Sequence, residues 1–362
     1  MIVLPKRVYE RARSVPPDRL PLSVYDLPLI DEHVRRLRAD LPPEVELHVA
    51  LPYVADPDLL AVLGPHVDGF TAQPGSAAAA EPGGVPLTLS GTGKSLAEIA
   101  EVAAHKGTCV EVESPEELHL AGHTARAAGR TLDVLLRVDP PLRPGSAAGP
   151  AAPSSGMDAA SLVACADAVR SGAPTRPVGF SVRLPPGGGG GATAAEHADG
   201  LLRALRPWSA MFGIESARYA IVGGTVNVPG GADDGTGFDW AGYGAGLAAL
   251  ARPGETVRVT PEGTPASWAG WLLAQVLDVR HNYGRAVAVV ALSERAPGSR
   301  QPAVVARDDD VSWGRPWQRP DLRGEPVTLL GKGAHDHVLA HDVPLPSIRP
   351  GDIVAFPPGD PG

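Results

Sequence analysis

The chain of 362 residues is poor in cysteine and in lysine, and both shortages narrow what it can do. Its two cysteines, Cys109 and Cys165, do not make a disulfide framework, and each lies in an apolar pattern that predicts a buried thiol. Primary amines, which form imines with carbonyl compounds, are also rare. Of the 32 basic residues only four are lysines: Lys6, Lys94, Lys106 and Lys332.

The sequence also lacks long hydrophobic runs and an excess of positive charge. No segment approaches the roughly 20 apolar residues that a membrane span needs, and the N-terminus has no apolar core of a signal peptide. The formal net charge of −9 argues against a general nucleic-acid or anionic-membrane role, because both require a basic surface. We therefore expect a cytoplasmic protein that binds neither nucleic acid nor membrane.

What the sequence does contain is an alternation of short apolar runs with helical patterns, from about residue 27 to residue 260. Strand–helix alternation repeated eight times predicts a (β/α)₈ barrel over residues 27–262, with a doubly wound open sheet as the main alternative. The eight predicted strands are 45–51, 67–71, 86–90, 109–112, 132–138, 178–184, 218–223 and 255–260.

From about residue 270 the pattern changes to short apolar runs separated by Pro and Gly turns. We expect a mostly β domain that combines residues 263–362 with residues 1–26, which could add a strand to it. The predicted strands there are 275–280, 286–292, 326–330 and 352–356. Two low-complexity stretches, 139–157 and 185–191, follow predicted barrel strands and are interpreted as loops at the catalytic face of the barrel.

The segment Ser90-Gly91-Thr92-Gly93-Lys94-Ser95 resembles the end of a phosphate-binding loop. The full pattern needs a glycine five positions before Gly93, and that position is Thr88. We therefore interpret the segment as a helix cap beside a solvated lysine.

Two groups of histidines have spacings that could hold a metal ion, but neither is complete. His119 and His123 stand four residues apart on a predicted helix, with no evident third ligand, and surface histidines are the preferred interpretation. His335 and His337, with His341 nearby, are interpreted as an exposed turn. We expect no metal site.

Consecutive glycines follow the predicted strand 218–223, in Val222-Gly223-Gly224-Thr225. Glycines at such a position let the backbone approach a ligand closely, and the bare N–H groups can bind phosphate. The same pattern is typical of a simple turn, so on its own it leaves both interpretations open.

Several segments together resemble the fold-type III pyridoxal-phosphate (PLP)-dependent decarboxylases, the family of ornithine and diaminopimelate decarboxylase, to which alanine racemase is more distantly similar. The resemblance implies a (β/α)₈ barrel joined to a C-terminal β domain, which agrees with the independent strand count. The matching segments are Ser23-Val24-Tyr25-Asp26, 47–51, 94–118, 135–140, 222–229, 238–250 and 325–356.

The resemblance does not extend to the residues that carry the family's chemistry. In that family a lysine after the first barrel strand forms the Schiff base with PLP, and here the corresponding stretch Val49-Ala50-Leu51-Pro52-Tyr53-Val54 has Pro52 at the lysine position. We therefore expect no catalytic residue, and PLP bound non-covalently if at all.

The resemblance implies losses at other family positions as well. The Gly-Gly-Gly-Phe-Gly phosphate loop is half preserved as Gly223-Gly224-Thr225-Val226-Asn227. Thr71 stands where the family has an acidic residue after the second strand, and Arg183 stands where it has the histidine that stacks on the cofactor. Thr260 replaces the glutamate at the pyridinium nitrogen, and Gly263 replaces the arginine at the phosphate. Ala334 replaces the cysteine donated across the dimer interface.

Three functions are compatible with a framework that is kept and a chemistry that is lost. The first is a pseudoenzyme, a partner or regulatory subunit that forms a homodimer or a heterodimer with an active PLP decarboxylase homologue. The second is a divergent enzyme or small-molecule binder for an acidic, amino-acid-like molecule, with Gly223, Gly224 and Thr225 near any phosphate. Its other contacts would come from Tyr53, Glu113, Asp139, Arg183 and Thr260. The third is a foldable chain with no role.

Overall fold

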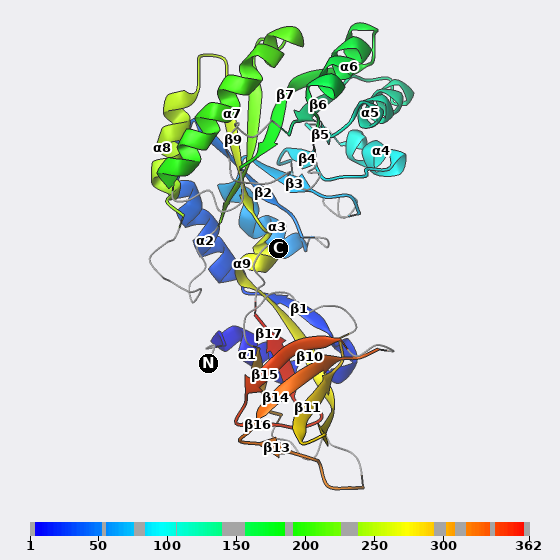
Figure 1. Ribbon diagram of the computed structural model, residues 1–362, viewed down its shortest axis with the longest axis vertical. Helices are drawn as coiled ribbons and strands as arrows, with labels where there is room; N and C mark the ends of the chain where they lie inside the picture. Colours follow the sequence, from blue (N-terminus) through cyan, green and yellow to red (C-terminus); the bar gives the residue numbers. More distant parts are fainter. Residues whose placement is uncertain are drawn as a thin grey trace. The chain divides into compact units, whose positions relative to one another are not determined.

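The computed structural model describes residues 4–52, 56–75, 84–105, 107–139, 156–184, 191–225, 238–292, 302–307, 316–333 and 337–357 (Figure 1). The chain divides into two compact units. One is Asp31–Pro265, and the other combines Met1–Ile30 with Ala266–Gly362.

The larger unit is a closed barrel of eight parallel strands in sequence order (Figure 1). The last strand pairs with the first, with Leu47 opposite Val259. The predicted barrel is therefore confirmed, and the alternative prediction of a doubly wound open sheet is wrong. The strands are β2 (Val45–Ala50), β3 (Gly69–Ala72), β4 (Leu87–Leu89), β5 (Cys109–Val112), β6 (Leu132–Arg137), β7 (Thr175–Arg183), β8 (Arg218–Thr225) and β9 (Thr256–Glu262).

Helices follow the strands and cover the barrel, and the predicted helix cap after Lys94 is confirmed. Ser95 and Glu98 form a reciprocal capping box, and the Ser114 side chain accepts a hydrogen bond from the Glu117 N–H. No described helix is long and apolar enough to cross a membrane. The helices are α2 (Leu27–Asp40), α3 (Pro57–Leu63), η2 (Gly64–His66), α4 (Leu96–Ala104), α5 (Pro115–Ala127), α6 (Ala159–Arg170), α7 (Gly191–Met211), α8 (Trp240–Leu250) and α9 (Pro265–Ala269).

Polar side chains line the barrel interior on several strands. Successive side chains of a strand point to opposite faces, and the buried Leu47 and Val49 of β2 alternate with Glu46 and His48. Glu46 lies opposite Arg258 of β9 and accepts a hydrogen bond from it, which places both on the inner face. Barrel interiors are ordinarily filled by branched apolar residues, so this interior departs from the usual pattern.

The smaller unit is built around a sheet in the order β12-β17-β10-β11-β14-β15. β1 (Leu22–Tyr25) pairs antiparallel with β10, which confirms that the N-terminal residues add a strand. The sequence pattern did not predict α1, β12, β13, β15 or β16. The elements are α1 (Lys6–Ser14), η1 (Pro17–Arg19), β10 (Gly270–Asn282), β11 (Arg285–Val290), β12 (Ala303–Val305), β13 (Leu322–Arg323), β14 (Pro326–Gly331), β15 (Val338–Pro344), β16 (Ser347–Ile348) and β17 (Ile353–Phe356).

A buried carboxylate, Asp352, connects the irregular segments of this smaller unit. It accepts hydrogen bonds from the Arg319 guanidinium at 2.8 Å and from the backbone N–H groups of Arg307 and Arg349. Burial raises the pKa of Asp352, and the hydrogen bonds together with the charges of Arg319 and Arg349 oppose that rise. The segments before β13 and β17 are therefore held to the end of β12 through one side chain.

Candidate functional site at the carboxyl end of the barrel

The carboxyl ends of the eight parallel strands meet at one rim, where barrel enzymes place their reactive groups. Pro52 is buried and is the second residue after β2, and the N–H of the preceding Leu51 donates to the Thr71 carbonyl oxygen at 2.7 Å. A proline side chain has no primary amine, so this position cannot form an imine.

Lys94 is the described lysine that follows a barrel strand, and its amine is already engaged. Its side chain is fully buried, and Nζ donates to Glu117 Oε2 at 2.8 Å and to the Gly91 carbonyl oxygen. The prediction of a solvated lysine is therefore wrong, because the partner carboxylate comes from the next β/α unit. Lys6 and Lys332 are exposed in the smaller unit, and Lys106 lies outside the described residues.

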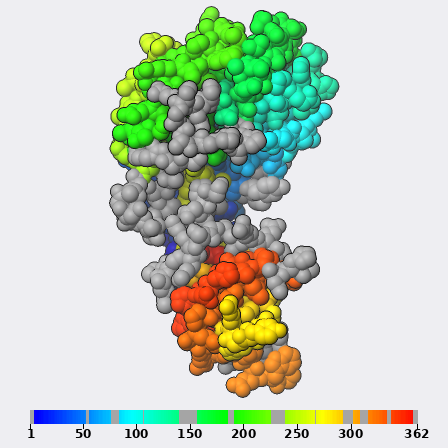
Figure 2. All heavy atoms as spheres, viewed as in Figure 1, coloured from blue at the N-terminus to red at the C-terminus, as the bar shows by residue number. Residues whose placement is uncertain are grey.

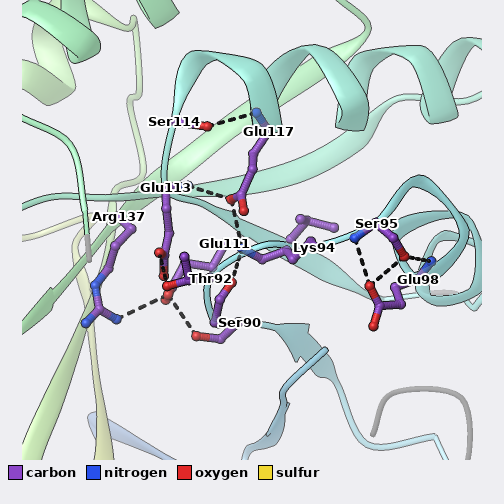
Figure 3. A network of polar contacts seen from close by, with 12 residues as sticks. Ser90, Thr92, Lys94, Ser95, Glu98, Glu111, Glu113, Ser114, Glu117 and Arg137 are labelled. Atoms are coloured by element: carbon purple, nitrogen blue, oxygen red, sulfur yellow. Dashed lines mark hydrogen bonds and ion pairs between the residues drawn. The ribbon is translucent and has the colours of Figure 1, made fainter. Parts of the chain in front are cut away.

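Carboxylates surround the loop that resembled a phosphate site (Figure 3). Besides the ion pair with Lys94, Glu117 Oε2 accepts from the Glu113 N–H, and Thr92 Oγ1 donates to Glu113 Oε2, both at 2.8 Å. These contacts join the β4–α4 connection to the start of α5. The Lys94 amine and the Thr92 hydroxyl donate hydrogen bonds to carboxylates of the protein itself, so we do not assign a phosphate site to this loop.

A buried ion pair lies just below the rim. Arg137 of β6 is 3.2 Å from Glu111 of β5, and Ser90 donates to the same Glu111 oxygen at 2.8 Å (Figure 3). Deeper in the barrel, Arg258 donates to Glu46 and to Thr88, each at 3.2 Å. These groups are not among the site residues predicted from the sequence, although charged residues at alternate positions of otherwise apolar strands signal them.

His48 lies in the same interior but is not poised for proton transfer near neutral pH. Burial, with the positive charges of Arg258 and Arg218, holds its pKa well below the usual range. The ring packs directly against Gly69, where an added Cβ would lie 2.0 Å from the His48 Cε1. His48 is therefore a neutral packing residue at physiological pH.

At the rim itself, the structure pairs Arg183 of β7 with Glu262 of β9. The closest N···O distance is 3.6 Å, and the side chains are 58% and 26% exposed. Thr260 is buried on β9, and Thr71 is partly buried on β3. The position that resembles the cofactor-stacking histidine therefore carries an ion-paired guanidinium.

The remaining predicted site residues are not brought into this arrangement. Glu113 is partly buried and hydrogen-bonded to Thr92, whereas Asp139 is exposed after β6. Gly263 follows β9 with a φ of 82° and has no side chain to offer. The predictions at Tyr53 and Ala334 lie outside the described residues.

The two glycines of the half-kept phosphate loop are required by the protein's own packing. Gly223 and Gly224 have φ values of 152° and 85°, in the region that favours glycine. A Cβ on Gly223 would lie 2.7 Å from Leu184, and one on Gly224 would lie 2.9 Å from the Trp240 ring. These glycines need no bound phosphate to explain them. Thr225, the next residue of the predicted loop, ends β8.

Two other predictions concern thiols and histidines. Cys109 and Cys165 are buried, as expected, and burial raises their pKa values to about 12 and about 11. His119 and His123 are exposed on α5, and no group of three metal-ligating side chains is present among the described residues. Of the three histidines expected in an exposed turn, His337 is partly buried with its ring against Gly331, His341 is exposed on β15, and His335 lies outside the described residues.

The residues present therefore do not fit a covalently bound PLP. The resemblance assigns the imine position to Pro52, and the buried Lys94 amine is held by Glu117. It also places Thr260 and Gly263 where the family has the glutamate at the pyridinium nitrogen and the phosphate-binding arginine. Threonine cannot place a negative charge beside a pyridinium nitrogen.

Comparison with solved structures places the fold among amino-acid decarboxylases. Lysine decarboxylase from Selenomonas ruminantium superimposes with a TM-score of 0.70 at 17% identity, covering 98% of this chain and 90% of that one. Diaminopimelate decarboxylase from Helicobacter pylori, complexed with L-lysine, gives 0.67 at 18%, covering 98% and 89%. Arginine decarboxylase from Paramecium bursaria Chlorella virus, bound to agmatine, gives 0.67 at 15%, covering 97% and 92%.

The chain thus has the fold of these decarboxylases, and the resemblance drawn from its sequence is confirmed at that level. No protein-family model matches it. Among curated proteins, the L-glutamyl-[BtrI acyl-carrier protein] decarboxylase of Niallia circulans is 31% identical over 170 residues. That match covers 45% of this chain and 40% of the relative, so the chain matches less than half the length of this protein.

Proposed function

We propose that this protein is a catalytically degenerate homologue of the PLP-dependent amino-acid decarboxylases and acts as a partner or regulatory subunit of an active homologue. Pro52 at the end of β2 carries the proposal, because an imine cannot form there. The retained barrel and sheet domain support it, since a subunit that only binds another chain needs the framework and not the chemistry.

An absorbance spectrum tests the loss of covalent chemistry. The purified chain is mixed with PLP, and spectra are recorded before and after borohydride, which reduces an imine to a stable amine. We expect no reduced PLP on a lysine of the barrel unit, whatever small amount is trapped on exposed amines such as Lys6 and Lys332. A single reduced PLP that peptide mass spectrometry places on Lys94 or Lys106 would show that a barrel lysine forms the imine, and the proposal would be wrong.

The partner role is tested separately by co-purification. A tagged chain is expressed with an active decarboxylase of the same fold, and the eluate is examined by size-exclusion chromatography with light scattering. We expect the active homologue to co-elute with this chain in one complex. A chain that retains no active homologue in any pairing, whether it is a monomer or a homodimer, would rule out the subunit role.

A second candidate is a binder of an acidic, amino-acid-like molecule, with PLP held non-covalently if present. Two observations favour it. Arg183 presents a guanidinium that is 58% exposed at the barrel rim, and guanidinium groups bind carboxylates in two-point contacts. The curated relative is named for an L-glutamyl group carried by an acyl-carrier protein, and a glutamyl group attached through one carboxyl keeps its other carboxylate free.

Calorimetry with L-glutamate and with a glutamyl thioester distinguishes this candidate. We expect Arg183→Gln to weaken binding by about tenfold, the size of one charge-assisted contact. Arg176→Gln is the matched control, because Arg176 lies on the same strand, is exposed and pairs with Asp133. Equal affinities of wild type and Arg183→Gln, or no heat of binding at all, would refute it.

A further inference from the structure

A groove on the outer surface of the barrel unit, between α5 and α6, is not part of the site at the rim. It has a volume of about 310 Å³, within the range of small-ligand pockets. Figure 2 shows α4, α5 and α6 as a continuous cyan-to-green surface. The groove is lined by His119, Gly122, His123, Arg126, Ala168, Ser171, Ala173 and Pro174.

The side chains on the two walls differ in kind. His119, His123 and Arg126 come from α5 at spacings of four and three residues, which places them along one face of the helix. The opposite wall comes from the end of α6 and the residues after it, and all its side chains are small or apolar apart from the Ser171 hydroxyl. No carboxylate lines the groove, although the chain carries a net charge of −9.

Nearby charges do not neutralise this basic wall. Asp167 of α6 is paired with Arg170 at 3.0 Å. The carbonyl groups at the end of α5, which would disfavour an anion, accept hydrogen bonds from the N–H groups of Ala128, Gly129 and Arg130. An anion in the groove would therefore meet donors from α5 and few competing acceptors.

Gly122 gives an independent indication that the groove is kept open. A glycine inside a helix destabilises it by about 0.5–1 kcal/mol relative to alanine. Packing does not require the glycine, because an added Cβ would meet Pro174, Ala173 and Thr175 at 3.6–3.8 Å, which is ordinary van der Waals contact. The missing methyl group leaves space next to Ala173 and Pro174, at the floor of the groove.

We propose that this groove binds a small molecule carrying a phosphate or carboxylate group, held by Arg126, His119 and His123. Arg126 supplies a permanent positive charge and a planar set of donors, and the two imidazoles add further N–H groups. The ligand lies over Gly122, and the chemistry of recognition is that of an oxyanion on a small organic body.

The test is calorimetry on the full chain with two probes, glycerol 3-phosphate and glutarate. We expect at least one to bind, and binding to weaken by about tenfold in Arg126→Gln through loss of one charge-assisted contact. Binding of the phosphate probe alone identifies a phosphate ligand, and binding of glutarate alone a carboxylate ligand. Arg203→Gln, which removes the same charge from an exposed arginine of α7 outside the groove, keeps wild-type affinity.

The variant Gly122→Ala distinguishes a groove that binds a ligand from one that has only a packing role. This variant is expected to raise the melting temperature by about 2 °C, since helix propensity improves without a clash, and to lose affinity for the probe. The proposal is overturned if neither probe binds, if Arg126→Gln binds as wild type does, or if Gly122→Ala is stabilised and keeps full affinity.

Discussion

At the scale of single residues, most of the charge inside this barrel is used for structure. Lys94 and Glu117 form a buried pair, and Glu111 and Arg137 form another just below the rim. A buried charge is tolerated when its partner and hydrogen bonds replace the lost water, and loss of one partner leaves the other without compensation. These pairs hold neighbouring β/α units in register rather than presenting a reactive amine or carboxylate.

The Lys94–Glu117 pair leads to a stability prediction. Lys94→Met is expected to lower the free energy of unfolding by about 3–5 kcal/mol, because the Glu117 carboxylate remains buried with only backbone partners. Urea denaturation followed by circular dichroism measures the change. Lys6→Met removes the same charge from an exposed i,i+4 pair and should leave the midpoint unchanged. An unchanged midpoint for Lys94→Met would contradict the structural role given to the pair.

At the scale of elements, contacts between successive β/α units decide which segments lie together. Arg206 of α7 makes a two-point contact with Glu255, at 2.9 Å for both N···O pairs, and also donates to the carbonyl oxygen of Leu250 at the end of α8. Glu255 stands just before β9. The contact therefore fixes the ends of α7 and α8 and the start of the last barrel strand relative to one another.

This contact predicts a pH dependence of stability. Burial raises the pKa of Glu255, but the hydrogen bonds and charge of Arg206, with the Arg252 N–H, lower it more, so the net pKa is below its ordinary value. The unfolded chain then takes up the proton at a higher pH than the folded chain does. The stabilisation is complete above the ordinary glutamate pKa and is lost as the pH falls through the lower folded-state value.

Urea denaturation between pH 3 and pH 7 checks this dependence. Glu255→Gln should be less stable than wild type at pH 7, and the difference should shrink toward the acid end because only the wild type loses the ion pair there. A stability difference that stays constant across the whole range would mean that Glu255 does not carry the linkage.

At the scale of the whole molecule, residues near the N-terminus pack with the C-terminal residues in one of the two units. The smaller unit combines residues from both ends of the chain, and β1 pairs with the long strand β10. Val8 and Ala12 of α1 pack in one apolar cluster with Trp271 and Leu273 of β10. The barrel unit contains its own complete ring of strands and does not need these contacts.

Removal of residues 1–25 should therefore destabilise one unit selectively. We expect limited proteolysis followed by mass spectrometry to show early cleavage after residue 266 in the shortened chain, while Asp31–Pro265 persists as a resistant fragment. In the full chain both regions should resist at the same protease concentration. Equal loss of both units in the shortened chain would show that they unfold as one.

Much of the barrel could be predicted from the sequence, because each strand carries a local apolar run and each helix a local start signal. The eight predicted strands correspond to β2–β9, and the cap at Ser95 starts a helix as expected. Prediction was weaker in the smaller unit, where β13 and β16 are two residues long and carry no periodicity. Helix α7 also continues through Pro207 to Met211, although proline ordinarily ends or kinks a helix.

At the candidate site too, the chemistry of single residues follows from the sequence, whereas the contacts between segments come from the fold. The sequence by itself determined that Pro52 has no amine and that Thr260 and Gly263 carry no charge, because those are properties of single residues. Only the tertiary structure decided that Lys94 is buried against Glu117, that Arg183 pairs with Glu262, and that Gly223 and Gly224 are required by Leu184 and Trp240. Apart from the Gly224–Trp240 contact, these contacts join residues from different β/α units, and closure of the barrel brings such residues together in a way that no local spacing encodes.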